Sequence, residues 1–156
     1  MLFVFLNNYL SYAPSAWCPY SKGDKELLEK VQKRAVMMVT NVRGNYEERL
    51  AILRLRKLED RRNRGDMIET YKILTGKSKV SLETWFCLAK EKDGVVNIRA
   101  TKGYLNLVVP PVPQSDIRRN FFSHRVVPFW NSLPESVKIS STSNHLRAAY
   151  DSLTSY

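Results

Sequence analysis

The segment 24–39 constrains the fold of this chain more than any other stretch. Its apolar residues recur at helical spacing within an arc of roughly 120°, the width of a core-facing stripe on an amphipathic helix. They are Leu27, Leu28, Val31, Ala35, Met38 and Val39. Asp24 suits the N-cap position, and Gly44 lies beyond the end, where a stop signal is expected. We therefore expect a helix over 24–39 that buries this stripe.

The polar side of the same segment carries acidic residues four positions before basic ones. Glu26 precedes Lys30, and Glu29 precedes Lys33, which is the favourable order for ion pairs along a helix. The pattern predicts that both lysines are paired.

Helical patterns recur further along the chain, at 46–53 after a cap at Asn45, at 57–75 before Gly76, at 117–127 before Pro128, and from Ser143 or Asn144 to about Leu153. Partial alternation of apolar and polar residues predicts a short β-hairpin over 95–109. We expect a mostly α protein, a small helical bundle with one short β-hairpin in its second half. The change of character after Gly76 divides a helical segment, 1–76, from an extension, 77–156, that holds the hairpin and two helices.

The charge balance of the chain indicates a polyanionic partner. Its 156 residues carry a formal net charge of +10, which suits nucleic acid or an anionic membrane surface. Acidic protein substrates are a further class of partner that this charge admits. The apolar start, Met1–Leu6, lacks a basic leader and is far shorter than the ~20 residues that span a bilayer. We expect no membrane partner. Because the two cysteines, Cys18 and Cys87, make no disulfide framework, we expect an intracellular protein with reduced thiols and without a targeting signal.

No pattern for catalysis or for a cofactor stands out. The aspartates are scattered, whereas two-metal phosphoryl transfer needs clustered carboxylates. Phosphate-binding glycine loops, nucleophile elbows and zinc-protease motifs are absent from the sequence. His124 and His145 are isolated from each other and from both cysteines, so no zinc site is expected. The sequence predicts no catalytic residue, no metal and no cofactor.

Basic side chains are the remaining candidates for function. The densest group is Arg54, Arg56, Lys57, Arg61, Arg62 and Arg64. Spacing predicts ion pairs from Asp60 to Arg64 and from Arg62 to Asp66, which leaves Arg54, Arg56, Lys57 and Arg61 as the nearest unpaired set for phosphate contact. Further candidates are Lys30, Lys33 and Arg34, and also Arg118 and Arg119.

Arg118 and Arg119 precede Phe121 and Phe122, so they fit two descriptions. The arginines can hold a nucleic-acid backbone beside a stacking platform. The alternative is that both rings belong to the core and both arginines are solvated.

Several blocks resemble one known family. They are Leu27–Ala35 (LLEKVQKRA), Tyr46–Leu50 (YEERL), Leu58–Gly76 (LEDRRNRGDMIETYKILTG) and Arg118–Pro134 (RRNFFSHRVVPFWNSLP), after Ser11–Tyr20 (SYAPSAWCPY). In this order they resemble the C-terminal part, beyond the catalytic palm, of reverse transcriptases of LINE-type non-LTR retrotransposons, of the jockey and chicken-repeat kind. The resemblance runs from about residue 10 to residue 153. The Ala-Asp-Asp motif, the fingers, the endonuclease and the zinc knuckle of that family are absent from this sequence.

The resemblance implies a thumb-like helical segment over 1–76 and a C-terminal extension over 77–156, without catalytic residues of their own. The function expected is non-specific binding of template RNA and primer DNA by their backbones, in a truncated copy of the element. Since a reverse transcriptase that primes on the chromosome works in the nucleus, the resemblance implies a nuclear or cytoplasmic location. The alternative is an inert or protein-interaction remnant that self-associates through the surface that once faced the palm.

Overall fold

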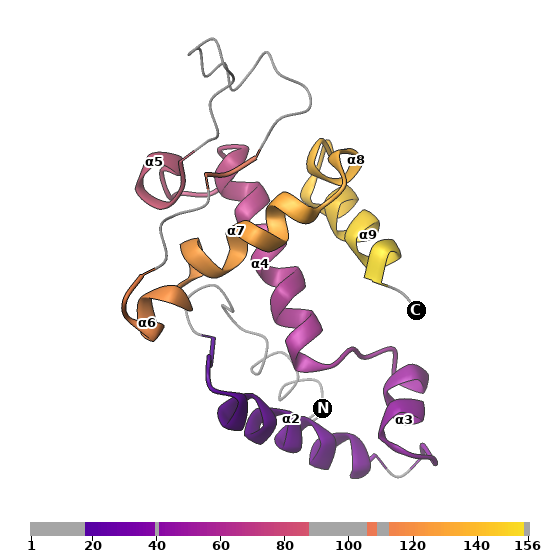
Figure 1. Ribbon diagram of the computed structural model, residues 1–156. Helices are drawn as coiled ribbons and strands as arrows, with labels where there is room; N and C mark the ends of the chain where they lie inside the picture. The colour runs from indigo at the N-terminus through magenta and orange to yellow at the C-terminus, as the bar shows by residue number, and fades with distance from the viewer. Residues whose placement is uncertain (1–17, 40, 88–105, 109–112, 155–156) are drawn as a thin grey trace. The chain divides into compact units, whose positions relative to one another are not determined.

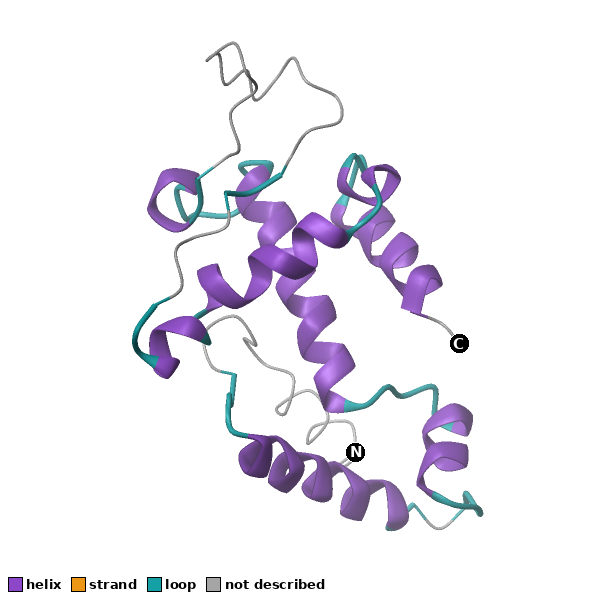
Figure 2. Ribbon diagram, in the orientation of Figure 1, coloured by secondary structure: helices purple, strands orange, loops and turns teal. Residues whose placement is uncertain are grey.

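The computed structural model describes residues 18–39, 41–87, 106–108 and 113–154. The described chain is mostly helical, as the sequence predicts, and loops connect its helices (Figures 1 and 2). Packing divides the chain into two compact units, Met1–Gly65 and Asp66–Tyr156. The boundary lies inside one helix, α4 (Leu58–Leu74). The sequence-based division at residue 76 assigns roles to two parts of the chain, and it stays a prediction because packing does not test roles.

In unit 1, helix α2 (Lys22–Met37) begins before the predicted start, with Ser21 rather than Asp24 at the N-cap. At the other end of the helix, Arg49 satisfies carbonyl groups that the last turn leaves without partners. Its guanidinium donates to the carbonyl oxygens of Val36, Met37 and Val39 at 3.1–3.2 Å. The end of α2 is therefore fixed by a side chain from the next helix.

The buried side of α2 differs from the predicted stripe. Gln32 and Val36 are buried, whereas Leu27, Val31 and Met38 are 58%, 44% and 74% exposed. The prediction that these three side chains are buried is wrong. The buried side follows the polar contacts of α2, which place Glu29 and Gln32 against the next two helices of the unit.

Those polar contacts form a network around Gln32. The Gln32 amide donates to the Tyr46 hydroxyl and to the Arg56 carbonyl oxygen, both at 3.1 Å. Tyr46 in turn donates to the Glu29 carboxylate. The second oxygen of Glu29 accepts the Leu58 backbone N–H at 3.0 Å, so it caps the start of α4. A buried amide with several partners fixes the relative position of elements that apolar packing alone would let slide.

Helix α3 (Tyr46–Ile52) has the predicted cap. Asn45 and Glu48 form a reciprocal capping box, with both hydrogen bonds at 2.9 Å. Gly44 precedes it with a φ of 117°, and a Cβ atom there would lie 2.3 Å from a Glu48 carboxylate oxygen. Only glycine fits this turn. The sequence indicates Gly44 only as a stop signal after the helix over 24–39 and does not predict this constraint.

Helix α4 is one helix with Gly65 inside it, as predicted. It ends at Leu74, and Gly76 follows with a φ of 67°, the left-handed conformation of a C-terminal glycine stop. Its second half belongs to unit 2.

Unit 2 also contains α5 (Leu82–Trp85), α6 (Asp116–Arg119), α7 (Phe122–Ser132), α8 (Glu135–Lys138) and α9 (Ser143–Thr154). Its core is built from α4 and α7, with further side chains from α8, α9, Phe86 and Leu107. The fully buried members include Trp130, Tyr71, Phe122, Met67, Leu107 and Leu146. The Tyr71 hydroxyl donates to the Ser140 carbonyl oxygen at 2.6 Å, which joins α4 to the turn between α8 and α9.

The predicted helix over 117–127 is two helices, α6 and α7, and Pro128 does not end the second. The break falls at Asn120 and Phe121. Proline removes one hydrogen bond from a helix, but Val126, Val127 and Trp130 on both sides of it are buried in the core. Their packing holds the helix together across Pro128.

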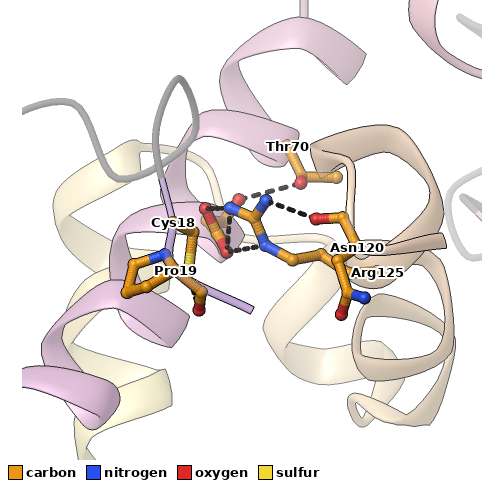
Figure 3. A network of polar contacts seen from close by, with 6 residues as sticks. Cys18, Pro19, Thr70, Asn120 and Arg125 are labelled. Atoms are coloured by element: carbon orange, nitrogen blue, oxygen red, sulfur yellow. Dashed lines mark hydrogen bonds and ion pairs between the residues drawn. The ribbon is translucent and has the colours of Figure 1, made fainter. Parts of the chain in front are cut away.

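A buried ion pair connects α4 to α7 in unit 2 (Figure 3). Arg125 donates to both carboxylate oxygens of Asp66, at 2.9–3.1 Å, and to the Asn120 carbonyl oxygen at 3.1 Å. Thr70 bonds the Asp66 carbonyl oxygen at 2.8 Å. Burial raises the pKa of Asp66, and Arg125 opposes that rise. Asp66 thus has Arg125 as an ion-pair partner, which the sequence-based pairing did not foresee.

The predicted β-hairpin over 95–109 lies outside the described residues except for 106–108. Within that short stretch, Leu107 is buried, and its N–H and carbonyl oxygen both bond to the Asn131 side chain at 2.8–2.9 Å. Lys138 is buried beside it and donates to Asn106 and to the Asn131 carbonyl oxygen. Burial lowers the pKa of Lys138.

Replacing Arg125 by glutamine should lower the free energy of unfolding by about 3–5 kcal/mol, because the buried Asp66 carboxylate loses its partner. The matched control is Arg119→Gln, which removes an exposed pair with Asp116 and should cost less than about 1 kcal/mol. Urea unfolding followed by circular dichroism measures both. Equal losses in the two variants would contradict the buried pair.

Tyr46→Phe should be about 1 kcal/mol less stable than the native chain near neutral pH, because it loses the bonds to Gln32 and Glu29. Burial and then the hydrogen bond to Glu29 raise the Tyr46 pKa. The folded tyrosine stays neutral above about pH 10, where the unfolded one ionises, so the native chain loses stability there that the variant keeps. The difference in unfolding free energy between the native chain and Tyr46→Phe should therefore be smaller at about pH 11 than at about pH 8. A constant gap would mean that Tyr46 is not in this network.

Candidate nucleic-acid interface

The outer side of α2 presents three neighbouring cations. Lys30, Lys33 and Arg34 have the i, i+3, i+4 spacing that places side chains next to one another on a helix, and all three are exposed. Within the part of the chain that the structure describes, no carboxylate pairs with any of them. The Lys33 ammonium lies 5.8 Å from the centre of the Tyr46 ring, a cation–π distance. We call these three residues the α2 basic face.

The predicted pairs of Glu26 with Lys30 and of Glu29 with Lys33 are wrong. Glu26 lies 4.0 Å from Lys22 instead. Glu29 is occupied by Tyr46 and by the N-terminus of α4. Because these contacts use the two carboxylates, the positive charges of Lys30 and Lys33 are left for another partner.

The basic segment 54–62 is more engaged than the sequence suggests. Lys57 pairs with Glu47 at 2.9 Å, and this hydrogen bond raises the Lys57 pKa. Arg61 is half-buried and donates to Gln32 at 3.4 Å, while burial lowers its pKa. The prediction that Lys57 and Arg61 are unpaired is wrong.

The other arginines of this segment differ in exposure. Arg56 is half-buried, and Arg62 is only 3% exposed. Arg54 is exposed, with a φ of 52°, a backbone conformation that is rare for arginine. That these residues contact nucleic acid stays a prediction, with Arg54 the most accessible of them.

A hollow of about 330 Å³ lies beside the start of α2. Its walls carry both signs of charge, and Lys25 pairs with Glu59 across 3.1 Å. Glu26 and Glu29 also line it. The lining also holds the cations Lys22, Lys57 and Arg62, but Lys22 pairs with Glu26 and Lys57 with Glu47, so these two lysines already have carboxylate partners.

In unit 2, the predicted pair of phenylalanines is divided between core and surface. Phe122 is 2% exposed, whereas Phe121 is 48% exposed. Phe121 stacks on Trp85, with ring centroids 5.4 Å apart and planes at 11°. Arg118 and Arg119 lie on the adjacent helix, α6, and Arg119 pairs with Asp116 at 3.2 Å. Sequence reasoning missed the stack, since a long segment separates the two aromatic residues and no local signal joins them.

Two further features of the described residues concern metal ions and membranes. No group of three histidine, cysteine, aspartate or glutamate side chains there is arranged to hold a metal ion. Nor does any helix in the described ranges have the length and apolarity of a membrane span.

Models of known protein families, curated proteins and solved structures were compared with the chain, and none of them matches it.

Replacing all of Lys30, Lys33 and Arg34 by glutamine should change the melting temperature little, because exposed substitutions usually fall within about 0.5 kcal/mol each. Arg62→Gln should be clearly destabilising, by about 2 kcal/mol or more, since it alters a buried charged group. Thermal melts by circular dichroism compare the two. A triple variant that unfolds as readily as Arg62→Gln would mean that the α2 basic face is structural.

Proposed function

We propose that this chain binds the phosphate backbone of nucleic acid without sequence preference, as a non-catalytic part of a LINE-type reverse transcriptase. The ligand is an RNA–DNA duplex or a single strand. One observation carries the proposal: Lys30, Lys33 and Arg34 are exposed together, and no carboxylate of the described chain neutralises them. Lysine and arginine contacts to phosphate position a protein on a strand and are indifferent to base sequence.

The charge of the whole chain supports the same ligand. A net charge of +10 attracts a polyanion over distances of about a Debye length, ~10 Å at 0.1 M salt. Encounter would therefore be fast, and the α2 basic face would then provide close contacts. Arg54 and Arg118, which are also exposed, are additional contact points in the two units.

The family resemblance supports the role. The block Leu27–Ala35 contains the whole α2 basic face, and the blocks Leu58–Gly76 and Arg118–Pro134 coincide with α4 and with α6 and α7. In a thumb-like part of a polymerase, helices hold template and primer while the chemistry takes place elsewhere. Such a protein would act where the element is copied, in the nucleus or the cytoplasm.

The salt dependence of binding tests the proposal. A fluorescently labelled RNA–DNA hybrid should bind more weakly as salt rises, with a linear relation between the logarithms of affinity and salt concentration. Removing the α2 basic face (Lys30→Gln, Lys33→Gln and Arg34→Gln) should make the slope shallower by about 0.9 for each lost phosphate contact. Fluorescence anisotropy measures both quantities.

The control removes the same amount of charge elsewhere. Lys72→Gln, Lys79→Gln and Arg147→Gln change side chains of unit 2, of which Lys79 and Arg147 are exposed and Lys72 is paired with Glu69. This variant should lose long-range attraction but keep the slope. If the two triple variants behave alike, net charge alone drives binding. If the folded native chain does not bind at low salt, the proposed function is wrong.

A second candidate function, association with protein, is favoured by the apolar residues that α2 exposes. Leu27, Val31 and Met38 lie on one side of the helix, and exposed apolar surface of this kind often marks an interface. The α2 basic face adjoins these residues, so two copies meeting there would repel each other. Screening by salt would then strengthen self-association, whereas salt weakens nucleic-acid binding. Sedimentation velocity at low and high salt, without nucleic acid, separates the two candidates.

A further inference from the structure

We propose that unit 2 contains a second site, which stacks an unpaired nucleobase on the exposed ring of Phe121 while Arg118 contacts the neighbouring phosphate. The site extends the proposed function, on which it rests, from phosphate binding to binding of single-stranded nucleic acid. It lies on different helices from the α2 basic face and is testable separately.

The Phe121 ring is held in place by other aromatic rings. Trp85 lies parallel to it, with centroids 5.4 Å apart. Trp85 in turn meets Phe122 edge-on at 5.8 Å, and Phe86 meets Phe122 in the same manner at 5.8 Å. Phe122 and Phe86 are buried in the core. The series of rings therefore runs from the core to the surface and ends at Phe121.

The exposed end of this series has the form of a stacking surface. Trp85 stacks on one face of Phe121, and the residue is still 48% exposed, which leaves room for a second planar group on the ring. The backbone is also fixed, because the Phe121 carbonyl oxygen accepts the N–H groups of His124 and Arg125 at 3.0 Å. A fixed, open aromatic face accepts any base, because every base has a π surface.

The charges around Phe121 favour nucleic acid over an apolar protein partner. Arg118 is exposed three residues before Phe121, and no carboxylate of the described chain pairs with it. Arg119 is held by Asp116, so Arg118 is the cation that is ready to contact an anion. A ligand that offers a planar ring and a nearby negative charge in each repeat is a single nucleic-acid strand.

The experiment compares two strands of equal length and charge. One is an oligothymidylate, and the other has the same phosphates but no bases (an abasic strand). The full chain should bind the oligothymidylate about ten-fold more tightly, an advantage typical of one stacked base. Phe121→Leu keeps apolar bulk at this position. It should abolish the preference by lowering the affinity for the base-bearing strand alone. Phe121→Trp should retain the preference.

Two charge variants distinguish the site at Phe121 from the α2 basic face. Arg118→Gln should lower the affinity for both strands. It should also make the slope of log affinity against log salt shallower by about 0.7, the value for one contact to a single strand. The variant without the α2 basic face should also weaken both strands and leave the preference intact. Circular dichroism spectra confirm that each variant is folded.

Equal binding of the two strands by the native chain would overturn the stacking site, while a loss in the α2 variant would leave the proposed function standing. If the native chain prefers the base-bearing strand and the α2 variant binds both strands as tightly as the native chain, the stacking site stands and the assignment of phosphate contacts to the α2 basic face is wrong. If Phe121→Leu changes the sedimentation of the chain and not its preference for bases, the aromatic surface is a protein contact and the proposal is wrong.

Discussion

The Glu29 carboxylate is the constraint on which the arrangement of unit 1 depends. It accepts the Tyr46 hydroxyl from α3 and the Leu58 backbone N–H at the start of α4. Gln32, one turn further along α2, adds bonds to Tyr46 and to the Arg56 carbonyl oxygen. These bonds select which side of α2 faces inward. An ordinary apolar stripe would have turned Leu27, Val31 and Met38 inward instead. Burying an amide without partners is costly, so Gln32 can occupy the inner side only because Tyr46 and the Arg56 carbonyl group bond to it.

The exposed surface of α2 follows from that choice. With Glu29 occupied and Glu26 beside Lys22, the cations Lys30, Lys33 and Arg34 lack carboxylate partners within the described chain. The same rotation of the helix exposes Leu27, Val31 and Met38. A single structural cause thus produces both the basic face that favours nucleic acid and the apolar residues that favour a protein partner. Their opposite responses to salt make the two functions separable.

The sequence predicted the elements better than their contacts. Helical periodicity, the Asn45 cap and the Gly76 stop are local signals, and the structure confirms α3 and α4 from them. The buried side of α2 was missed because it depends on Tyr46 and Leu58, which the periodicity of α2 does not include. Likewise, the partners of Asp66 and Phe121 come from other helices. The candidate cations were all visible as residues, but their ranking required knowing which carboxylates were already engaged.

Lysine footprinting of the full chain identifies the lysines that contact nucleic acid. The protein is treated with an amine-reactive reagent at low salt, with and without an RNA–DNA hybrid, and modified lysines are identified by mass spectrometry. The hybrid should protect Lys30 and Lys33, while Lys79, which is exposed in unit 2, should react as before. Protection of Lys79 with Lys30 and Lys33 still reactive would contradict the assignment of the phosphate contacts to α2.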